Sequence, residues 1–198
     1  MRFLSIVLVS ILAIGSVHAD TLPTKQQSDD RSFSTLNVDK FTDAPQRVLK
    51  VARLDAPPEV VFEKIANHRN MKEWAPMIEH WVEVDNSNSI TPGLNNVGTI
   101  RVCPVGGNKI VEDILWFEPG VGYAYHARAD TSPALVDHLG VMALESDGNG
   151  GSYLVWRQYF KNNGTIAVQS RAMAAMMPGM LESAFDQLIE VYGGEVVL

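Results

Sequence analysis

The sequence contains one cysteine, Cys103, among its 198 residues, so the chain cannot form an internal disulfide. The domain must therefore be stable through its apolar core alone. Basic residues are also few: 16 Lys and Arg stand against 23 Asp and Glu, and the net charge is −7. No cluster of basic residues interrupts this balance. Because nucleic acids are bound through positive patches, we expect no nucleic-acid partner.

Sequence motifs of common catalytic and cofactor sites are absent as well. The chain has no Gly-x-Ser-x-Gly motif, no P-loop and no dinucleotide-binding glycine pattern. Its histidines lack the spacing of a His-Glu-x-x-His zinc site. We therefore expect neither a metal nor a cofactor. Cys103 has no neighbouring base in the sequence, which favours a small buried apolar group over a nucleophile.

The main apolar run is short and lies at the N-terminus. It extends over residues 3–14, follows Arg2, and precedes Val17-His18-Ala19, which suits signal peptidase. A membrane span needs about 20 residues, so the run is too short for a comfortable one. We predict a signal peptide over residues 1–19 with cleavage after Ala19, a periplasmic or secreted protein, and no stable membrane insertion after cleavage. A retained anchor is the alternative.

The remaining chain divides into two parts by composition. Residues 20–45 are polar, with Gln26-Gln27-Ser28-Asp29-Asp30 at their centre, and this predicts a flexible N-terminal arm. Residues 46–198 contain no internal repeat or linker. Their length suits one domain with its own core.

The order of elements predicted within residues 46–198 indicates an α+β fold. A strand is expected over residues 46–54, followed by a helix beginning at Pro57-Pro58, because proline is tolerated in a first helical turn. A second short helical piece is expected over residues 67–76. Further strands are predicted at residues 78–84, 98–105, 109–117, 121–130, 136–145 and 152–162. This unbroken series predicts an antiparallel meander and not alternating βαβ units.

A long amphipathic helix is predicted from Thr165 to Tyr192. Apolar side chains recur along one face at steps of three and four: Met173, Met177, Leu181, Ala184, Leu188 and Val191, with Met176 and Met180 widening the stripe. We expect a kink or short break at Pro178-Gly179, because proline removes a helical hydrogen bond. Gly193-Gly194 suits the C-terminal stop. A helix of this length needs a large apolar partner, which the sheet would provide.

The first predicted turn fixes the register of two central strands. A two-residue hairpin loop at Gly106-Gly107 places Arg101 directly opposite Glu112. Side chains alternate between the two faces of a sheet, so this charge pair shares one face. We assign that face to the inside, toward the long helix.

The second predicted turn extends the same face into the next strand. A turn at Pro119-Gly120 places Ile114 opposite Tyr125 and Trp116 opposite Tyr123. These four residues then join the charge pair on the inner face. A one-residue error in the loop would reverse the assignment.

The methionines of the long helix suggest how the inner space is used. Their side chains are flexible and polarisable, so a methionine-rich helix against a curved sheet is suited to bind an apolar ligand. The alternative is that Met173, Met176, Met177 and Met180 simply fill the core.

Several short stretches together resemble a known superfamily. They are Ala56–Phe62, Trp74-Ala75-Pro76, Gly98–Arg101, Glu112-Asp113, Tyr123-Ala124-Tyr125 and Leu154-Val155-Trp156. In this order the chain resembles the START/Bet v 1-like (SRPBCC) superfamily, in particular its polyketide cyclase/dehydrase and lipid-transport group. The resemblance covers about residues 48–192. It implies a helix-grip fold: a curved seven-stranded antiparallel sheet wrapped around the C-terminal helix, two short helices after the first strand, and hydrophobic ligands bound between them. It supplies no catalytic residue.

The candidate ligand-binding residues lie on the inner face, in the short-helix region and on the long helix. They are Trp74, Arg101, Glu112, Ile114, Trp116, Tyr123, Tyr125, His138, Met176, Met177 and Met180. Arg101 and Glu112 would orient the polar end of an apolar ligand, or form a structural ion pair. Glu112 is the one candidate general base. The turns leave open which face His138 and Arg157 occupy.

These observations predict an exported binding or carrier protein for a hydrophobic small molecule or lipid. The alternative is an enzyme of the polyketide cyclase/dehydratase type, with Glu112, Arg101 and Tyr125 in the same cavity. A third possibility is an interaction module whose interior is filled by side chains.

Overall fold

The computed structural model describes residues 31–162 and 167–198. The predicted signal peptide, residues 20–30 of the predicted arm and the first two residues of the predicted C-terminal helix lie outside the described residues. The elements are β1 (Ser32–Phe33), β2 (Leu36–Asn37), η1 (Val38–Lys40), β3 (Gln46–Leu54), α2 (Pro58–Ile65), η2 (His68–Glu73), β4 (Glu83–Asp85), β5 (Ile100–Val105), β6 (Asn108–Glu118), β7 (Gly122–Ala127), β8 (Val136–Ser146), β9 (Ser152–Lys161), α3 (Ala167–Tyr192) and β10 (Gly194–Val196).

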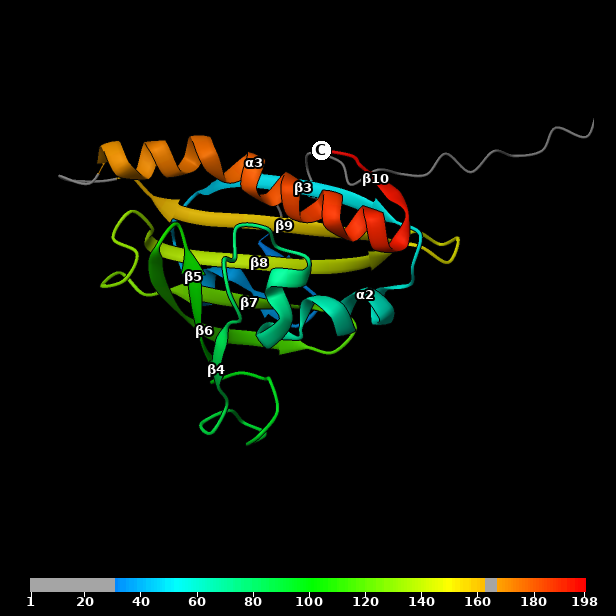
Figure 1. Cartoon of the computed structure of the whole chain (residues 1–198), viewed down its shortest axis with the longest axis horizontal. Helices are drawn as coiled ribbons and strands as arrows, with labels where there is room; N and C mark the ends of the chain where they lie inside the picture. Colours follow the sequence, from blue (N-terminus) through cyan, green and yellow to red (C-terminus); the bar gives the residue numbers. More distant parts are fainter. Residues whose placement is uncertain (1–30, 163–166) are drawn as a thin grey trace, which may run out of the picture.

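One large antiparallel sheet organises the fold, as the sequence predicts. Its strand order is β10-β3-β9-β8-β7-β6-β5-β4, which adds the short C-terminal strand β10 to the seven expected strands. In Figure 1, α3 runs along the sheet near β3 and β9, and α2 lies on the same side. The main apolar core lies between these helices and what we call the inner face of the sheet. The architecture is therefore the predicted helix-grip arrangement.

The two short helical segments form where they are expected. Helix α2 has proline in its first turn and buries Val61, Phe62 and Ile65. The piece predicted over residues 67–76 is the 3₁₀ helix η2, which buries His68 and Met71. Both segments cover the inner face and so contribute to the core.

The strand predicted over residues 78–84 is mostly absent, because only Glu83–Asp85 joins the sheet as β4. Ile78 and Val82 are nevertheless buried in the main core. The amide of Val82 donates to the carbonyl of Arg69, at 3.4 Å, and not to a neighbouring strand. The alternating pattern therefore reflects packing by a loop.

Of the kink or short break predicted at Pro178-Gly179, the break does not occur, since residues 167–192 are continuously helical. Met177 and Leu181, on either side of the proline, are both buried against the core. This packing holds the helix where the proline removes a hydrogen bond. Gly193, with a φ of +76°, ends the helix as predicted.

Residues 31–45, which we call the N-terminal strap, pack against the outer face of the sheet. Leu36, Val38 and Ala44 are fully or almost fully buried there. Arg31 fastens the strap by donating hydrogen bonds to the carbonyls of Thr42, at 2.5 Å, and Ala44, at 3.1 Å. Residues 31–45 of the segment predicted as a flexible arm are therefore packed on the sheet. The few apolar residues of this polar segment pack against the outer face of the sheet, and together they form a second apolar cluster.

Within the described residues, no helix is long and apolar enough to cross a membrane.

Candidate functional site

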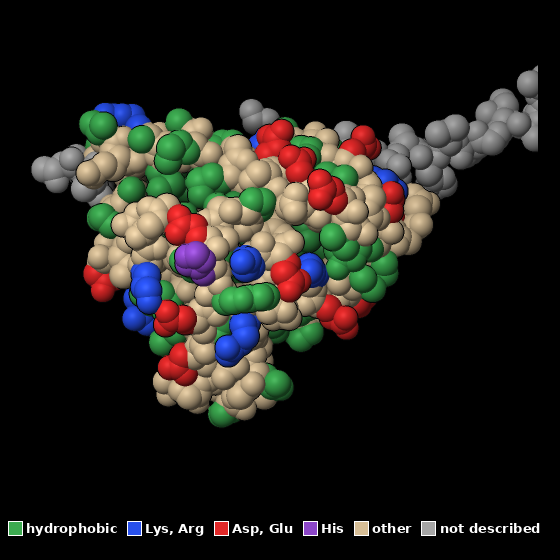
Figure 2. Space-filling view, viewed as in Figure 1, with side chains coloured by type: hydrophobic (Ala, Val, Ile, Leu, Met, Phe, Trp, Pro, Cys, Tyr) green, Lys and Arg blue, Asp and Glu red, His purple; other side chains and the backbone are tan. Residues whose placement is uncertain are grey.

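A cavity of about 100 Å³ lies between the inner face of the sheet and the N-terminal half of α3. Five methionines line it: Met71 and Met77 from the η2 region, and Met173, Met177 and Met180 from α3. On the outside of the molecule, Figure 2 shows acidic side chains gathered over the C-terminal half of α3 and apolar ones over its N-terminal half. The cavity thus lies under the less polar part of the helix.

Arg101 and Glu112 lie side by side at one end of the cavity, in the predicted register. Both glycines of the Gly106-Gly107 turn have positive φ, as this hairpin type requires. Arg101 Nε donates to Glu112 Oε2 at 2.5 Å, and only 1% of the Arg101 side chain is exposed. The same carboxylate oxygen accepts from Cys103 Sγ at 3.4 Å. Both contacts involve Oε2, so Oε1 is the oxygen available to a ligand.

His68, at the start of η2, contacts Arg101 at this ionic end of the cavity. Its Nδ1 lies 3.1 Å from Arg101 Nη1, which carries only hydrogens to donate, so Nδ1 accepts and Nε2 bears the proton. Burial, with the nearby Arg101 charge, holds the pKa of His68 well below its usual value. His68 is therefore a neutral support for the arginine. His68 is not among the site residues predicted from the sequence.

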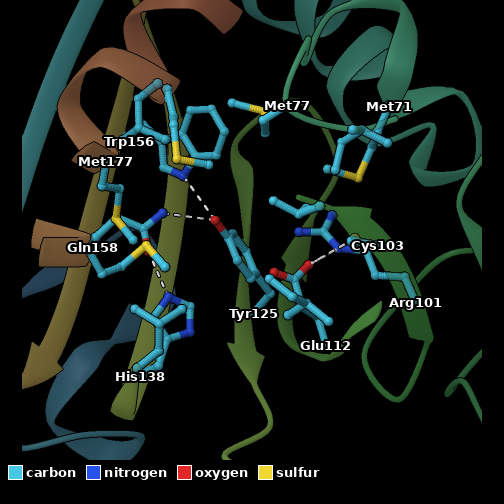
Figure 3. A pocket seen from close by; sticks show the side chains of 17 residues that line it. Met71, Met77, Arg101, Cys103, Glu112, Tyr125, His138, Trp156, Gln158 and Met177 are labelled. Carbon is cyan, nitrogen blue, oxygen red and sulfur yellow. Dashed lines mark hydrogen bonds and ion pairs between the residues drawn. The ribbon is translucent and has the colours of Figure 1, made fainter. Parts of the chain in front are cut away.

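Tyr125 lies between the Arg101–Glu112 pair and a second polar group, which consists of Gln158 and His138 (Figure 3). Its ring lies 4.5 Å from the guanidinium carbon of Arg101, an arrangement that favours a cation–π contact. Its hydroxyl oxygen accepts from Trp156 Nε1 at 3.2 Å and from Gln158 Nε2 at 2.9 Å. Burial raises the pKa of Tyr125, so the hydroxyl keeps its proton.

His138 belongs to the second polar group and lies on the inner face of the sheet. A bulge between Val136 and Leu139, with Asp137 at a φ of +52°, turns His138 inward. The bulge places His138 beside Ala127, whose amide donates to His138 Nδ1 at 2.9 Å. Burial lowers the pKa of His138 to about 4, so the ring is neutral at pH 7.

The turns also left open which face of the sheet Arg157 occupies, and the structure places it on the outer face. It is 1% exposed, and its guanidinium carbon lies 4.0 Å from the ring centre of Phe33 in the strap. It therefore supports the strap and takes no part in the cavity.

The structure contradicts the prediction that Trp116 belongs to the site. The β6–β7 loop has three residues, not two, so Phe117 and not Trp116 lies opposite Tyr123. Trp116 faces outward, where its Nε1 donates to Thr35 Oγ1 of the strap at 2.8 Å. A bulge at Leu115 then restores the expected register, and Ile114 does lie opposite Tyr125.

Four further candidates lie outside the cavity wall. Ile114 and Tyr123 are buried beneath it, and the Tyr123 hydroxyl donates to Met142 Sδ at 2.9 Å. Trp74, expected near the mouth, is fully buried with its ring centre 6.0 Å from that of Trp156. Met176 is 57% exposed, because it lies one helical step beyond the buried face.

The cavity wall also contains residues that are not among the predicted site residues. Gln158 and Trp156 belong here, because the pairing of β8 and β9 brings both beside Tyr125. Met71 and Met77 come from the η2 region, whose packing had no clear periodic signal. The other apolar members are Ile78, Cys103, Val105, Ile110, Leu135, Met173 and Leu181. Of these, Cys103 and Ile110 follow from the predicted strand alternation and Met173 and Leu181 from the helical stripe.

Among the described residues, no three His, Cys, Asp or Glu side chains are grouped closely enough to hold a metal ion. The polar groups of the cavity are instead suited to hydrogen bonding.

Comparisons with known proteins agree with this architecture. Residues 45–193 match the model of the family described as polyketide cyclase / dehydrase and lipid transport. A search of curated proteins found no match. Among solved structures, a protein called XoxI from Bacillus cereus has 13% identity and a TM-score of 0.58 over 73% of this chain and 94% of its own.

Two further solved structures have the same fold. An uncharacterised protein from Bacillus thuringiensis is 18% identical, with a TM-score of 0.55 over 73% of this chain and 96% of its own. An HSP90 activator from Plasmodium falciparum is 12% identical, with a TM-score of 0.52 over 76% of this chain and 98% of its own. At these identities the likeness concerns the fold alone.

Proposed function

Because the chain belongs to the polyketide cyclase/dehydrase and lipid-transport family of the START/Bet v 1-like superfamily, we propose that it binds a hydrophobic small molecule or lipid in the cavity beneath α3. The observation that carries the proposal is the composition of the cavity wall. Five flexible methionines surround a small number of fixed polar groups, and this combination is common in ligand sites.

The volume of the cavity gives the proposal a physical condition. About 100 Å³ is less than the ~300 Å³ or more of a typical ligand site, so a larger ligand must displace side chains. Methionine is the residue best suited to this, because its unbranched chain adopts new rotamers at little cost. The methionines of α3 would therefore move when a ligand enters.

Binding or carriage is a better-supported activity than catalysis. Glu112 Oε2 already contacts Arg101 Nε at 2.5 Å and Cys103 Sγ at 3.4 Å, so this oxygen serves a structural ion pair and is not free to contact a substrate. An enzyme of the cyclase/dehydratase type would still use Glu112 Oε1 as its base. Native mass spectrometry of the freshly isolated protein separates the two: a carrier retains an unaltered lipid or small molecule, whereas an enzyme converts an added candidate substrate and loses that activity in Glu112→Gln.

We further propose that the protein works outside the cytoplasm. The support is the N-terminal sequence, in which Arg2, the apolar run of residues 3–14 and Ala19 follow the order of a cleavable signal. Mass determination of the mature chain tests this, with Asp20 expected as the first residue. A chain that begins at Met1 contradicts it.

A pair of adjacent methionines gives a sharp test of the cavity. Met177→Trp places a bulky ring in a wall of a cavity of about 100 Å³, and we expect it to reduce ligand retention at least roughly tenfold. Met176→Trp adds the same ring at a side chain that is 57% exposed, and we expect retention to be unchanged. Ligand retention is measured by native mass spectrometry, and unfolding curves verify that both variants are folded. Equal retention in the two variants contradicts the proposed site.

A further inference from the structure

The second polar group of the cavity has a fixed direction of hydrogen bonding, which begins at the backbone. The amide of Ala127 can only donate, so His138 Nδ1 accepts. The neutral ring must then carry its proton on Nε2, which lies 2.7 Å from Gln158 Oε1 and donates to it. This fixes the orientation of the Gln158 amide, and its Nε2 donates to Tyr125.

Tyr125 therefore has no freedom to accept further hydrogen bonds. A hydroxyl oxygen has two lone pairs, and the N–H groups of Trp156 and Gln158 occupy both. Its own O–H proton has no acceptor among the described residues. Because Tyr125 lines the cavity and stays protonated, it presents a hydrogen-bond donor to whatever occupies the space (Figure 3).

The charges around the cavity add to zero. Arg101 and Glu112 neutralise each other at 2.5 Å. Burial raises the pKa of the Cys103 thiol, and it lowers that of His138, so both are uncharged at pH 7. The other wall residues carry no charge. An anionic ligand would bring an unpaired charge beside Glu112 in an apolar space, which is costly.

On this basis we propose that Tyr125 is the specificity-determining residue of the cavity, and that it selects an uncharged ligand with a carbonyl-class acceptor at its polar end. The proposal rests on the proposed function. It excludes carboxylate ligands such as fatty acids from the same site. His138 and Gln158 also line the cavity, and we assign them a positioning role because their hydrogen bonds hold the Tyr125 hydroxyl in this orientation.

Three probes of equal heavy-atom number test this selection: acetophenone, cumene and benzoate. They carry, respectively, a neutral carbonyl acceptor, no polar group, and a carboxylate. Binding is followed at pH 7 by NMR of ¹³C-methyl-methionine, with the five cavity methionines as reporters and Met176 as the internal reference. We expect acetophenone to bind about three- to tenfold more tightly than cumene, which is the contribution of one hydrogen bond. Benzoate should bind most weakly.

Two variants connect the effect to the hydroxyl. Tyr125→Phe should remove the preference for acetophenone while cumene binds as before. Gly140→Ala should do the same with the hydroxyl still present, because its added Cβ would lie 2.3 Å from the Tyr125 ring and displace it. Gly179→Ala, whose Cβ meets no atom within 4 Å, is the control and should keep the preference.

The outcomes separate the two proposals. Equal binding of acetophenone and cumene, or tightest binding of benzoate, overturns the selection by Tyr125 and leaves the cavity function standing. A preference that survives in Tyr125→Phe also overturns it. If none of the three probes perturbs the cavity methionines, the proposed function itself fails.

Discussion

Replacing Glu112 by leucine should lower the free energy of unfolding by about 3–5 kcal/mol, the usual cost of breaking a buried ion pair from one side. Arg101 is 1% exposed and would keep its charge without its carboxylate partner. Its remaining hydrogen-bond contact is the neutral ring of His68. Urea denaturation at pH 7 measures the loss, because urea, unlike guanidinium chloride, does not screen charges.

A double replacement shows whether the loss arises from the unpaired charge. In Arg101→Met/Glu112→Leu both charges are gone, and apolar pairs of similar volume are often as stable as a buried ion pair. We therefore expect most of the lost stability to return. Glu83→Leu is the matched control, because its ion pair with Lys109 is about two-thirds exposed and should contribute less than about 1 kcal/mol. A double variant as unstable as Glu112→Leu would show that the side-chain shape matters and the charge does not.

The long elements of the fold could be predicted because their periodicity is strong. The strands at 46–54 and 152–162 differ from β3 and β9 by one residue or fewer at each end, and the C-terminal helix ends at Tyr192 as predicted. The N-terminal strap could not be predicted in this way. Its burial depends on Leu36, Val38 and Ala44 meeting the outer face of the sheet, a contact between segments distant in sequence.

The candidate site could be predicted only where the neighbouring turns were predicted correctly. The Gly106-Gly107 loop requires positive φ at both positions, which glycine provides, and the Arg101–Glu112 pair followed from it. The next loop has one residue more than its sequence indicates, so the prediction placed Trp116 on the wrong face of the sheet. Bulges such as the one before Leu139 add a residue without a sequence signal. Gln158 was missed because its role depends on His138, whose position such a bulge decides.

Acidification from pH 7 to pH 5 should destabilise the protein. The folded-state pKa of His138 is about 4, whereas the unfolded chain has the usual value of 6.5. Between these values the unfolded state binds a proton that the folded state refuses, so stability falls as pH falls below 6.5, and this contribution levels off below pH 4. For His138 alone the expected loss is roughly 2 kcal/mol between pH 7 and pH 5. The pKa of His68 is shifted in the same direction and adds to the loss.

The physical cause of this acid sensitivity is burial, and the neighbours of His138 change it only in part. Burial is the largest effect; the Gln158 hydrogen bond and the Glu112 charge favour the protonated ring, whereas His126 and Arg101 oppose it. His138→Gln cannot titrate, and we expect it to lose about 2 kcal/mol less than the natural protein between pH 7 and pH 5. Urea denaturation at the two pH values measures the difference, and NMR of the His138 ring follows its protonation directly. A ring that titrates near pH 6.5, or a variant with the same pH dependence as the natural protein, would contradict the buried neutral His138 on which the hydrogen-bond direction of Tyr125 depends.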